Sequence, residues 1–102
     1  MTNYKYKLKF LPEVLSEWKK TDKTIKEAFR KMLRKRLDEP RRPNQALSGL
    51  KDCYKLKLRK SGFRLIYYVR DSDLIVTVLT INKREDNIVY DIARNRLPNM
   101  EL

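Results

Sequence analysis

The 102-residue sequence contains no histidine. This absence excludes the Ser–His and Cys–His nucleophile pairs, the histidine-based mechanism of ribonucleases and most zinc sites. Any catalysis by this chain must therefore depend on lysine, arginine, tyrosine or carboxylate groups. We expect no metal and no other cofactor.

Cysteine and long apolar segments are also scarce. The single cysteine, Cys53, excludes an internal disulfide and is typical of a reducing compartment. Nothing in the sequence could activate its thiol, so we expect a small core residue. The longest nearly unbroken apolar run, Leu74 to Ile81, is too short to span a bilayer, and the first residues carry no apolar segment typical of a signal peptide. We therefore expect a cytoplasmic protein with no membrane partner.

Acidic residues are few relative to basic ones. The chain has 25 Lys and Arg against 13 Asp and Glu, a formal net charge of +12. An excess of this size favours a polyanionic partner, which could be RNA, DNA, an anionic membrane surface or an acidic protein. The hydrophobic fraction of 41% argues against disorder, and the length predicts a single domain over residues 1–102.

The first part of the chain predicts a strand followed by a helix. Strict alternation over residues 4–10 is typical of a half-buried strand, whose lysines would protect an edge of the sheet. The expected buried face consists of Tyr4, Tyr6, Leu8 and Phe10. Helical spacing then predicts a short helix that ends near Lys20, with Pro12 in its first turn. Its apolar stripe is Leu11, Val14, Leu15 and Trp18, and we expect Trp18 to be a core anchor.

A second helix is predicted over residues 21–39. Thr24 and Glu27 have the spacing of a capping box, and Asp22 is an alternative start. Pro40 ends the helix, and residues 41–48 form the only linker-like stretch. The apolar stripe consists of Ile25, Phe29, Met32, Leu33 and Leu37.

The second half of the chain predicts three strands and a final helix. Residues 53–58 and 63–70 flank the turn Lys60-Ser61-Gly62 and form a hairpin. Asp71 and Asp73 are interpreted as turn formers, and the run 74–81 is apolar on both faces, which indicates a central strand. Asp86 or Asn87 can cap the last helix, which is expected to extend to Arg96. Its stripe is Ile88, Val89, Ile92 and Ala93.

The predicted order β-α-α-β-β-β-α places the chain in the α+β class. We expect one compact domain with a mainly antiparallel sheet and with the helices packed on one face. No internal repeat and no glycine-rich phosphate loop is found in the sequence.

Five side chains form the candidate functional cluster. Lys55 and Lys57 are two residues apart on one strand and share a face, and Arg64 on the adjoining strand could lie beside them. Arg84 follows the third strand, and Tyr90 falls off the apolar stripe of the last helix. RNA cleavage by its own 2′-OH passes through a transition state with extra negative charge, which fixed cations stabilise. Clustered cations also lower the pKa of a lysine toward the range of a general base, and an aromatic ring can stack on a base.

The same residues also allow an ordinary interpretation. In a chain with 25 basic residues, Lys55, Lys57 and Arg64 could form a solvated strand face, and Tyr90 a surface tyrosine. From composition and spacing alone, this interpretation is the commoner one.

Three motifs resemble the RelE family of toxins. The run Asp52-Cys-Tyr-Lys-Leu-Lys-Leu-Arg-Lys-Ser-Gly-Phe-Arg-Leu-Ile-Tyr resembles the central hairpin of that family. Glu17-Trp-Lys-Lys in the first helix and Lys83-Arg-Glu, six residues before Tyr90, are similar too, so the resemblance covers nearly the whole chain. It implies a compact fold related to microbial ribonucleases, and an endoribonuclease that cuts mRNA in the ribosomal A site.

By this resemblance, each candidate residue receives a role. Lys57 would be the base on the 2′-OH, Lys55 and Arg64 would stabilise the phosphate, Arg84 would assist the leaving 5′ oxygen, and Tyr90 would stack on the nucleotide. An arginine is a poor proton donor at neutral pH, so electrostatic assistance by Arg84 is the alternative to a general-acid role. The chain departs from the family at Phe63, where a tyrosine is frequent.

The resemblance also implies partners. These are the ribosome with its mRNA, a cognate RelB-like antitoxin that silences the toxin, and operator DNA only indirectly through the antitoxin complex. Two other functions stay open from the sequence, a non-catalytic RNA- or ribosome-binding module and a gyrase poison of the ParE branch. Members of that branch generally lack the cationic set present here.

Overall fold

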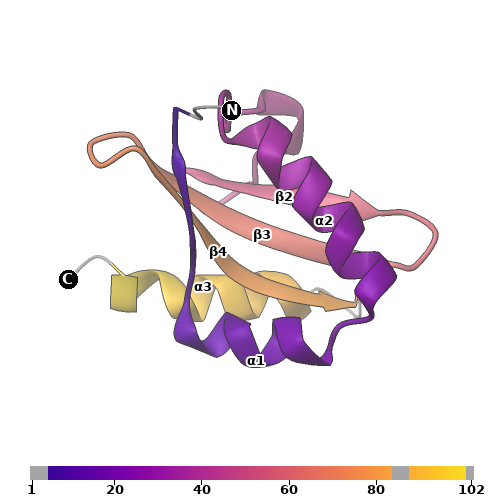
Figure 1. Cartoon of the computed structure of the whole chain (residues 1–102). Helices are drawn as coiled ribbons and strands as arrows, with labels where there is room; N and C mark the ends of the chain where they lie inside the picture. Colours follow the sequence, from indigo (N-terminus) through magenta and orange to yellow (C-terminus); the bar gives the residue numbers. More distant parts are fainter. Residues whose placement is uncertain (1–4, 84–87, 101–102) are drawn as a thin grey trace.

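The computed structural model describes residues 5–83 and 88–100, and within them a four-stranded sheet lies between helices (Figure 1). The elements follow the predicted order β-α-α-β-β-β-α, with one additional 3₁₀ turn. They are β1 (Lys7–Phe10), α1 (Pro12–Lys20), α2 (Lys23–Arg36), η1 (Pro43–Gln45), β2 (Cys53–Leu58), β3 (Phe63–Arg70), β4 (Ile75–Lys83) and α3 (Ile88–Met100). Among the described residues, no helix has the length and apolar character needed to cross a membrane.

The strands lie in the order β1-β4-β3-β2. β1 is parallel to β4, and the pairs β2–β3 and β3–β4 are antiparallel, so the prediction of a mainly antiparallel sheet is confirmed. The predicted hairpin and the central position of the apolar strand β4 are confirmed as well. β1 is an edge strand, and its lysines are exposed.

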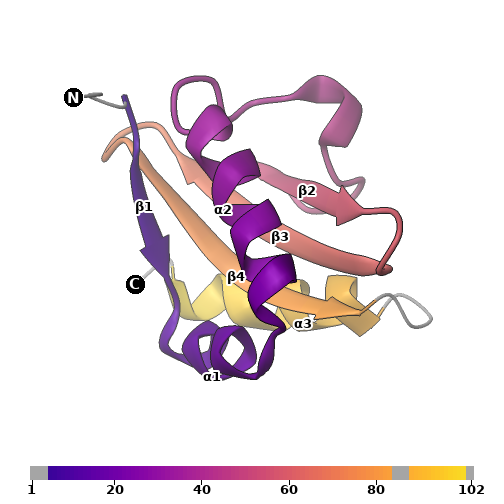
Figure 2. The same cartoon turned by 45° about the vertical axis from the view of Figure 1, so that its right-hand side comes forward.

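Apolar cores lie on both faces of the sheet. On one face, α2 buries Phe29 and Leu33 against Leu65 and other side chains of the strands. On the opposite face, α3 buries Val89 and Ala93 against Cys53, Ile66 and Leu79. Figures 1 and 2 show α2 in front of the sheet and α3 behind β4. The prediction that all helices pack on one face is therefore wrong: a strand that is apolar on both faces needs cover on both.

Several local predictions also need correction. The capping box is wrong, because α2 begins at Lys23 after the alternative start, Asp22. Leu8 is 37% exposed because it lies on an edge strand, and Leu15 is 47% exposed because α1 turns Val14 and Trp18 to the core instead. Ile88, which is 46% exposed, does not join Val89 in the core. Tyr4, Asp86 and Asn87 lie outside the described residues.

Two core predictions are confirmed. Cys53 is 1% exposed, and burial raises the pKa of its thiol to about 12, so the thiol stays protonated and inert. Trp18 packs edge-on against Phe10 with ring centroids 5.2 Å apart, and it adjoins the core on the α2 face.

The turn between β3 and β4 is tied to the start of the chain. Asp71 accepts hydrogen bonds from the Tyr6 hydroxyl at 2.6 Å and from Arg41, whose guanidinium also donates to Asp52. These donors favour the ionised carboxylate and lower the pKa of Asp71, the Tyr6 hydrogen bond being the largest cause. The same hydrogen bond raises the pKa of Tyr6, because it favours the protonated phenol.

These contacts predict how stability depends on acid. Asp71 binds its proton more weakly in the folded chain than in the unfolded chain, where its pKa has the usual value of 3.8. The ionised carboxylate therefore stabilises the fold at pH values above 3.8. This contribution is lost as the pH falls through the lowered pKa. Tyr6→Phe removes the main donor, so its free energy of unfolding should fall less than that of the wild type between about pH 6 and about pH 3.

Urea titrations at the two pH values measure this difference. Asp73→Asn is the matched control, because it removes a carboxylate of the same turn that pairs with Arg70 instead. An equally steep acid dependence in Tyr6→Phe and the wild type would contradict the assignment.

Candidate functional site

The β2–β3 hairpin brings the predicted cations together. Lys57 lies directly opposite Arg64 in the antiparallel register, and Lys55 lies opposite Ile66. Gly62 sets this register with a φ of +78°, and its amide donates to the carbonyl of Leu58. Because opposite residues share a face, all three cations lie on the face of the sheet that α3 covers.

Tyr90 reaches the same face from α3. Its neighbour Val89 is fully buried and, with Ala93, fixes the helix on Ile66. Tyr90 thereby lies at the margin of the helix contact, half-buried, and its hydroxyl accepts a hydrogen bond from the Arg64 guanidinium. The Arg64 Cζ atom is 5.7 Å from the ring centroid of Tyr90. The Arg64 guanidinium is thus held between β3, which carries it, and the Tyr90 side chain.

Two grooves open around these residues. A groove of about 300 Å³ is cationic and is lined by Lys57, Leu58, Arg59, Gly62, Phe63 and Arg64. A groove of about 480 Å³ is more apolar and is lined by Ala46, Leu47, Ser48, Leu50, Lys55, Tyr90, Asp91 and Arg94. The Arg64–Tyr90 hydrogen bond joins a wall of one groove to a wall of the other. A third groove, of about 410 Å³, lies over β3 and β4 between the start of α1 and Arg96 of α3, and it is lined by none of the described candidate residues.

Four of the five predicted residues therefore share one surface. Lys55, Lys57, Arg64 and Tyr90 converge as expected, whereas Arg84 lies outside the described residues. Cations directly opposite each other on a sheet repel each other, which reduces the stability of the fold. A bound anion would relieve this repulsion, so the Lys57–Arg64 pair is suited to binding an anion. With an aromatic ring beside it, the pair can hold a phosphate and a base of one nucleotide.

Sequence reasoning missed several residues around this surface. Arg59 and Phe63 line the cationic groove, and Asn82 lies opposite Arg64 in the β3–β4 register. Glu17 and Arg96 form an ion pair at 2.8 Å that joins α1 to α3. The hairpin pattern indicated the face of Arg59, but a pair 79 residues apart gives no local signal.

Comparison with known proteins shows the family. A model of the ParE toxin of the type II toxin–antitoxin system parDE matches residues 8–88. A RelE-like toxin protein of Escherichia coli is 48% identical over 93 residues, which cover 91% of this chain and 98% of the relative. The mRNA interferase toxin RelE of E. coli K12 is 42% identical, over 90% of this chain and 97% of the relative.

A solved structure agrees with this result. A double arginine-to-alanine mutant of E. coli RelE, in complex with an antitoxin RelBc peptide, superposes with a TM-score of 0.78 at 42% identity. The match covers 87% of this chain and 94% of the solved one. Fold and sequence agree, and the chain belongs to the RelE family of type II toxins.

Proposed function

We propose that this protein is an endoribonuclease toxin that cleaves mRNA in the ribosomal A site and thereby inhibits translation. The observation that carries the proposal is the Lys57–Arg64 pair, held opposite each other with Tyr90 on the arginine. The 42% identity of this chain to a relative named mRNA interferase toxin RelE supports the same reaction. The reaction takes place in the cytoplasm, where the mRNA is translated.

Each residue has a role in the proposed reaction. The 2′-OH attacks the adjacent phosphorus, Lys57 takes the 2′-OH proton, and the bond to the 5′ oxygen breaks. Lys55 and Arg64 stabilise the negative charge that develops on the phosphate. Tyr90 stacks on the nucleotide and keeps the attacking oxygen in line.

Arg84 assists the leaving 5′ oxygen. Its role is electrostatic, because a guanidinium retains its proton at neutral pH, and the leaving oxygen takes its proton from water. The reaction uses fixed cations of the chain in place of a metal ion, and Lys55 and Arg64 supply the charge that a metal would provide.

A RelB-like antitoxin is the proposed inhibitor. E. coli RelE has been solved with a peptide of its antitoxin. With a net charge of +12, this chain should bind an acidic segment that covers the Lys55–Arg64 face or displaces α3, and α3 carries Tyr90. Contact with operator DNA would occur only through the antitoxin complex.

Expression in cells tests the proposed function. Primer extension across several transcripts should show cuts within translated frames and none in transcripts whose initiation is blocked. Arrested translation with intact mRNA would instead indicate a non-catalytic ribosome-binding module. Cleaved DNA with intact mRNA would indicate a gyrase poison of the ParE type.

A further inference from the structure

The edge of β4 is only partly covered by β1. The parallel pairing ends at Phe10 and Val78, whereas β4 continues to Lys83. Past that point, the carbonyl of Leu79 and the amide of Ile81 receive side-chain partners instead of a strand. Such groups are costly to leave unpaired in a half-buried position.

Glu17 and Arg96 supply these partners. Arg96 donates to the Leu79 carbonyl at 2.6 Å, and a Glu17 carboxylate oxygen accepts from the Ile81 amide at 3.2 Å. The two side chains also pair with each other through two hydrogen bonds, at 2.8 and 3.1 Å. They are only 18% and 17% exposed, so the pair is largely shielded from solvent. Geometry of this kind, with two parallel contacts, fixes orientation as well as distance.

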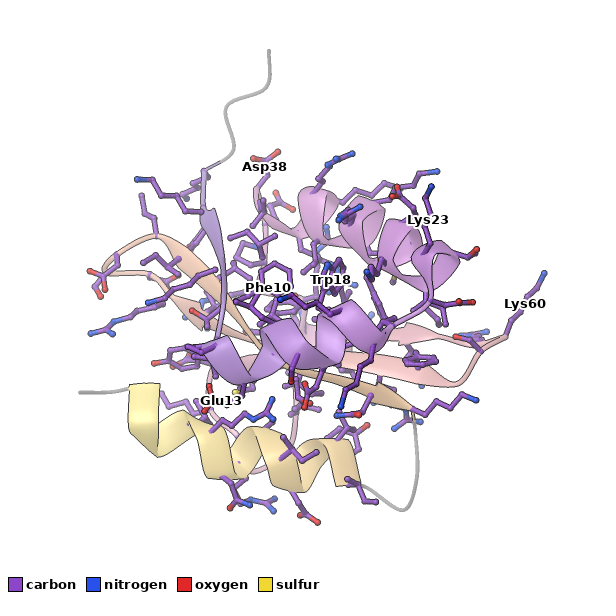
Figure 3. All side chains as sticks on the ribbon, turned by 60° about the horizontal axis from the view of Figure 1, so that its bottom comes forward. Phe10, Glu13, Trp18, Lys23, Asp38 and Lys60 are labelled. Atoms are coloured by element: carbon purple, nitrogen blue, oxygen red, sulfur yellow. The ribbon has the colours of Figure 1, made fainter. Side chains whose placement is uncertain are left out.

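The pair joins three elements. Glu17 lies on α1, Arg96 lies on α3, and β4 lies between their contacts. Figure 3 shows α1 and α3 running side by side, with side chains filling the space between them. Thr80 also donates to Glu17, at 3.1 Å, so the carboxylate is held from the strand as well.

The remaining attachments of α3 are modest. Its fully buried side chains, among those described, are Val89 and Ala93, both small. Tyr90 and Arg96 hold the helix by polar contacts six residues apart, or about 9 Å along the helix axis. The angle of α3 on the sheet, and with it the place of Tyr90 over Arg64, depends on both ends being held.

The Glu17 carboxylate is also linked to the strand positions that carry Arg64 and Lys57. Asn82 donates to Glu17 at 3.4 Å and lies opposite Arg64, which in turn lies opposite Lys57. Glu17 therefore contacts the strand residue opposite Arg64 without lining either groove around the proposed catalytic residues.

We propose that Glu17 and Arg96 form a latch that positions α3, so that Tyr90 is held in line with Arg64 and Lys57. Both are positioning residues, and neither touches the RNA. The inference rests on the proposed function for its effect on cleavage. The latch itself is a property of the folded chain.

Neutral variants of the latch provide the test. Glu17→Gln and Arg96→Gln keep side chains that can hydrogen-bond but remove the ion pair. Each should slow single-turnover cleavage of ribosome-bound mRNA about tenfold or more, because misplacing a reacting group by a fraction of an ångström is costly. Ribosome affinity should stay within about twofold, since one charge contributes little to a surface with many phosphate contacts. The double variant should be no slower than the slower single variant, because the two residues act as one unit.

Hydrogen exchange separates positioning from a general loss of stability. Amides of α3 should exchange faster in both variants, while those of α2 keep their wild-type rates. Glu27→Gln is the matched control, because it breaks the exposed Arg30–Glu27 pair on α2 and should change neither cleavage nor α3 exchange. Unchanged α3 exchange, or additive losses in the double variant, would overturn the latch. If the wild type cleaves no mRNA, the proposed function fails, and the exchange of α3 still decides on the latch.

Discussion

Replacing Lys57 with alanine is expected to slow single-turnover cleavage of ribosome-bound mRNA by about a hundredfold or more, and Arg84→Ala should do the same. Both charges act on the transition state in our account, Lys57 on the attacking oxygen and Arg84 on the leaving one. Lys57 lies directly opposite Arg64, so its removal leaves half of the cationic pair. Quenched-flow cleavage with excess ribosomes measures the chemical step without the binding step.

Ribosome affinity separates this result from a docking defect. One charge among 25 basic residues contributes little to binding, so both variants should keep most of their affinity. Lys5→Ala and Lys9→Ala are the controls, because Lys9 lies exposed on the edge strand β1 and Lys5 lies exposed just before it. They should lose slight affinity and cleave at nearly the wild-type rate. If all four variants lose affinity and rate in proportion, the cationic face is a docking surface and the assigned active site is wrong.

Cleavage is expected to require the ribosome. The chain has no histidine, and the described residues that line the cationic groove include no carboxylate. A site of this composition has no strong base, so the cleavage rate should depend on the ribosome holding the RNA with its 2′-OH in line for attack. Ribosome-bound mRNA should be cut faster than the same RNA in solution by about three orders of magnitude, within the range that fixed geometry can supply.

Side-by-side rates with purified protein measure this dependence. Free RNA of the same sequence, at the same protein concentration and ionic strength, is the control, because binding to RNA is strongly salt-dependent. Equal rates on free and ribosome-bound RNA would show that the site is a general ribonuclease.

The strands of the site could be predicted because their signals are local. Alternation on both sides of Lys60-Ser61-Gly62 determines which side chains share a face, so Lys55, Lys57 and Arg64 were correctly placed together. Helical spacing placed Tyr90 off the apolar stripe, whereas in the structure it is half-buried and packs against the core that α3 covers. The α+β class follows from the order of the same elements.

The arrangement of the helices could not be predicted in the same way. Helical periodicity shows that a helix buries one side, but not which face of a sheet receives it. The apolar pattern of β4 on both faces was the available signal that helices cover both. The Glu17–Arg96 pair had no signal, because its partners meet only after α1, β4 and α3 are assembled.

The chemistry of the cut ends tests the central claim most directly. Attack by the 2′-OH leaves a 2′,3′-cyclic phosphate, or the 3′-phosphate formed from it, on one fragment and a 5′-hydroxyl on the other. Mapping both ends of mRNA cut on ribosomes by the wild-type protein should find these groups at positions inside the translated frame, with Lys57→Ala producing few such ends. Fragments with a 3′-hydroxyl and a 5′-phosphate would show that water, not the 2′-OH, is the nucleophile, and would contradict the account.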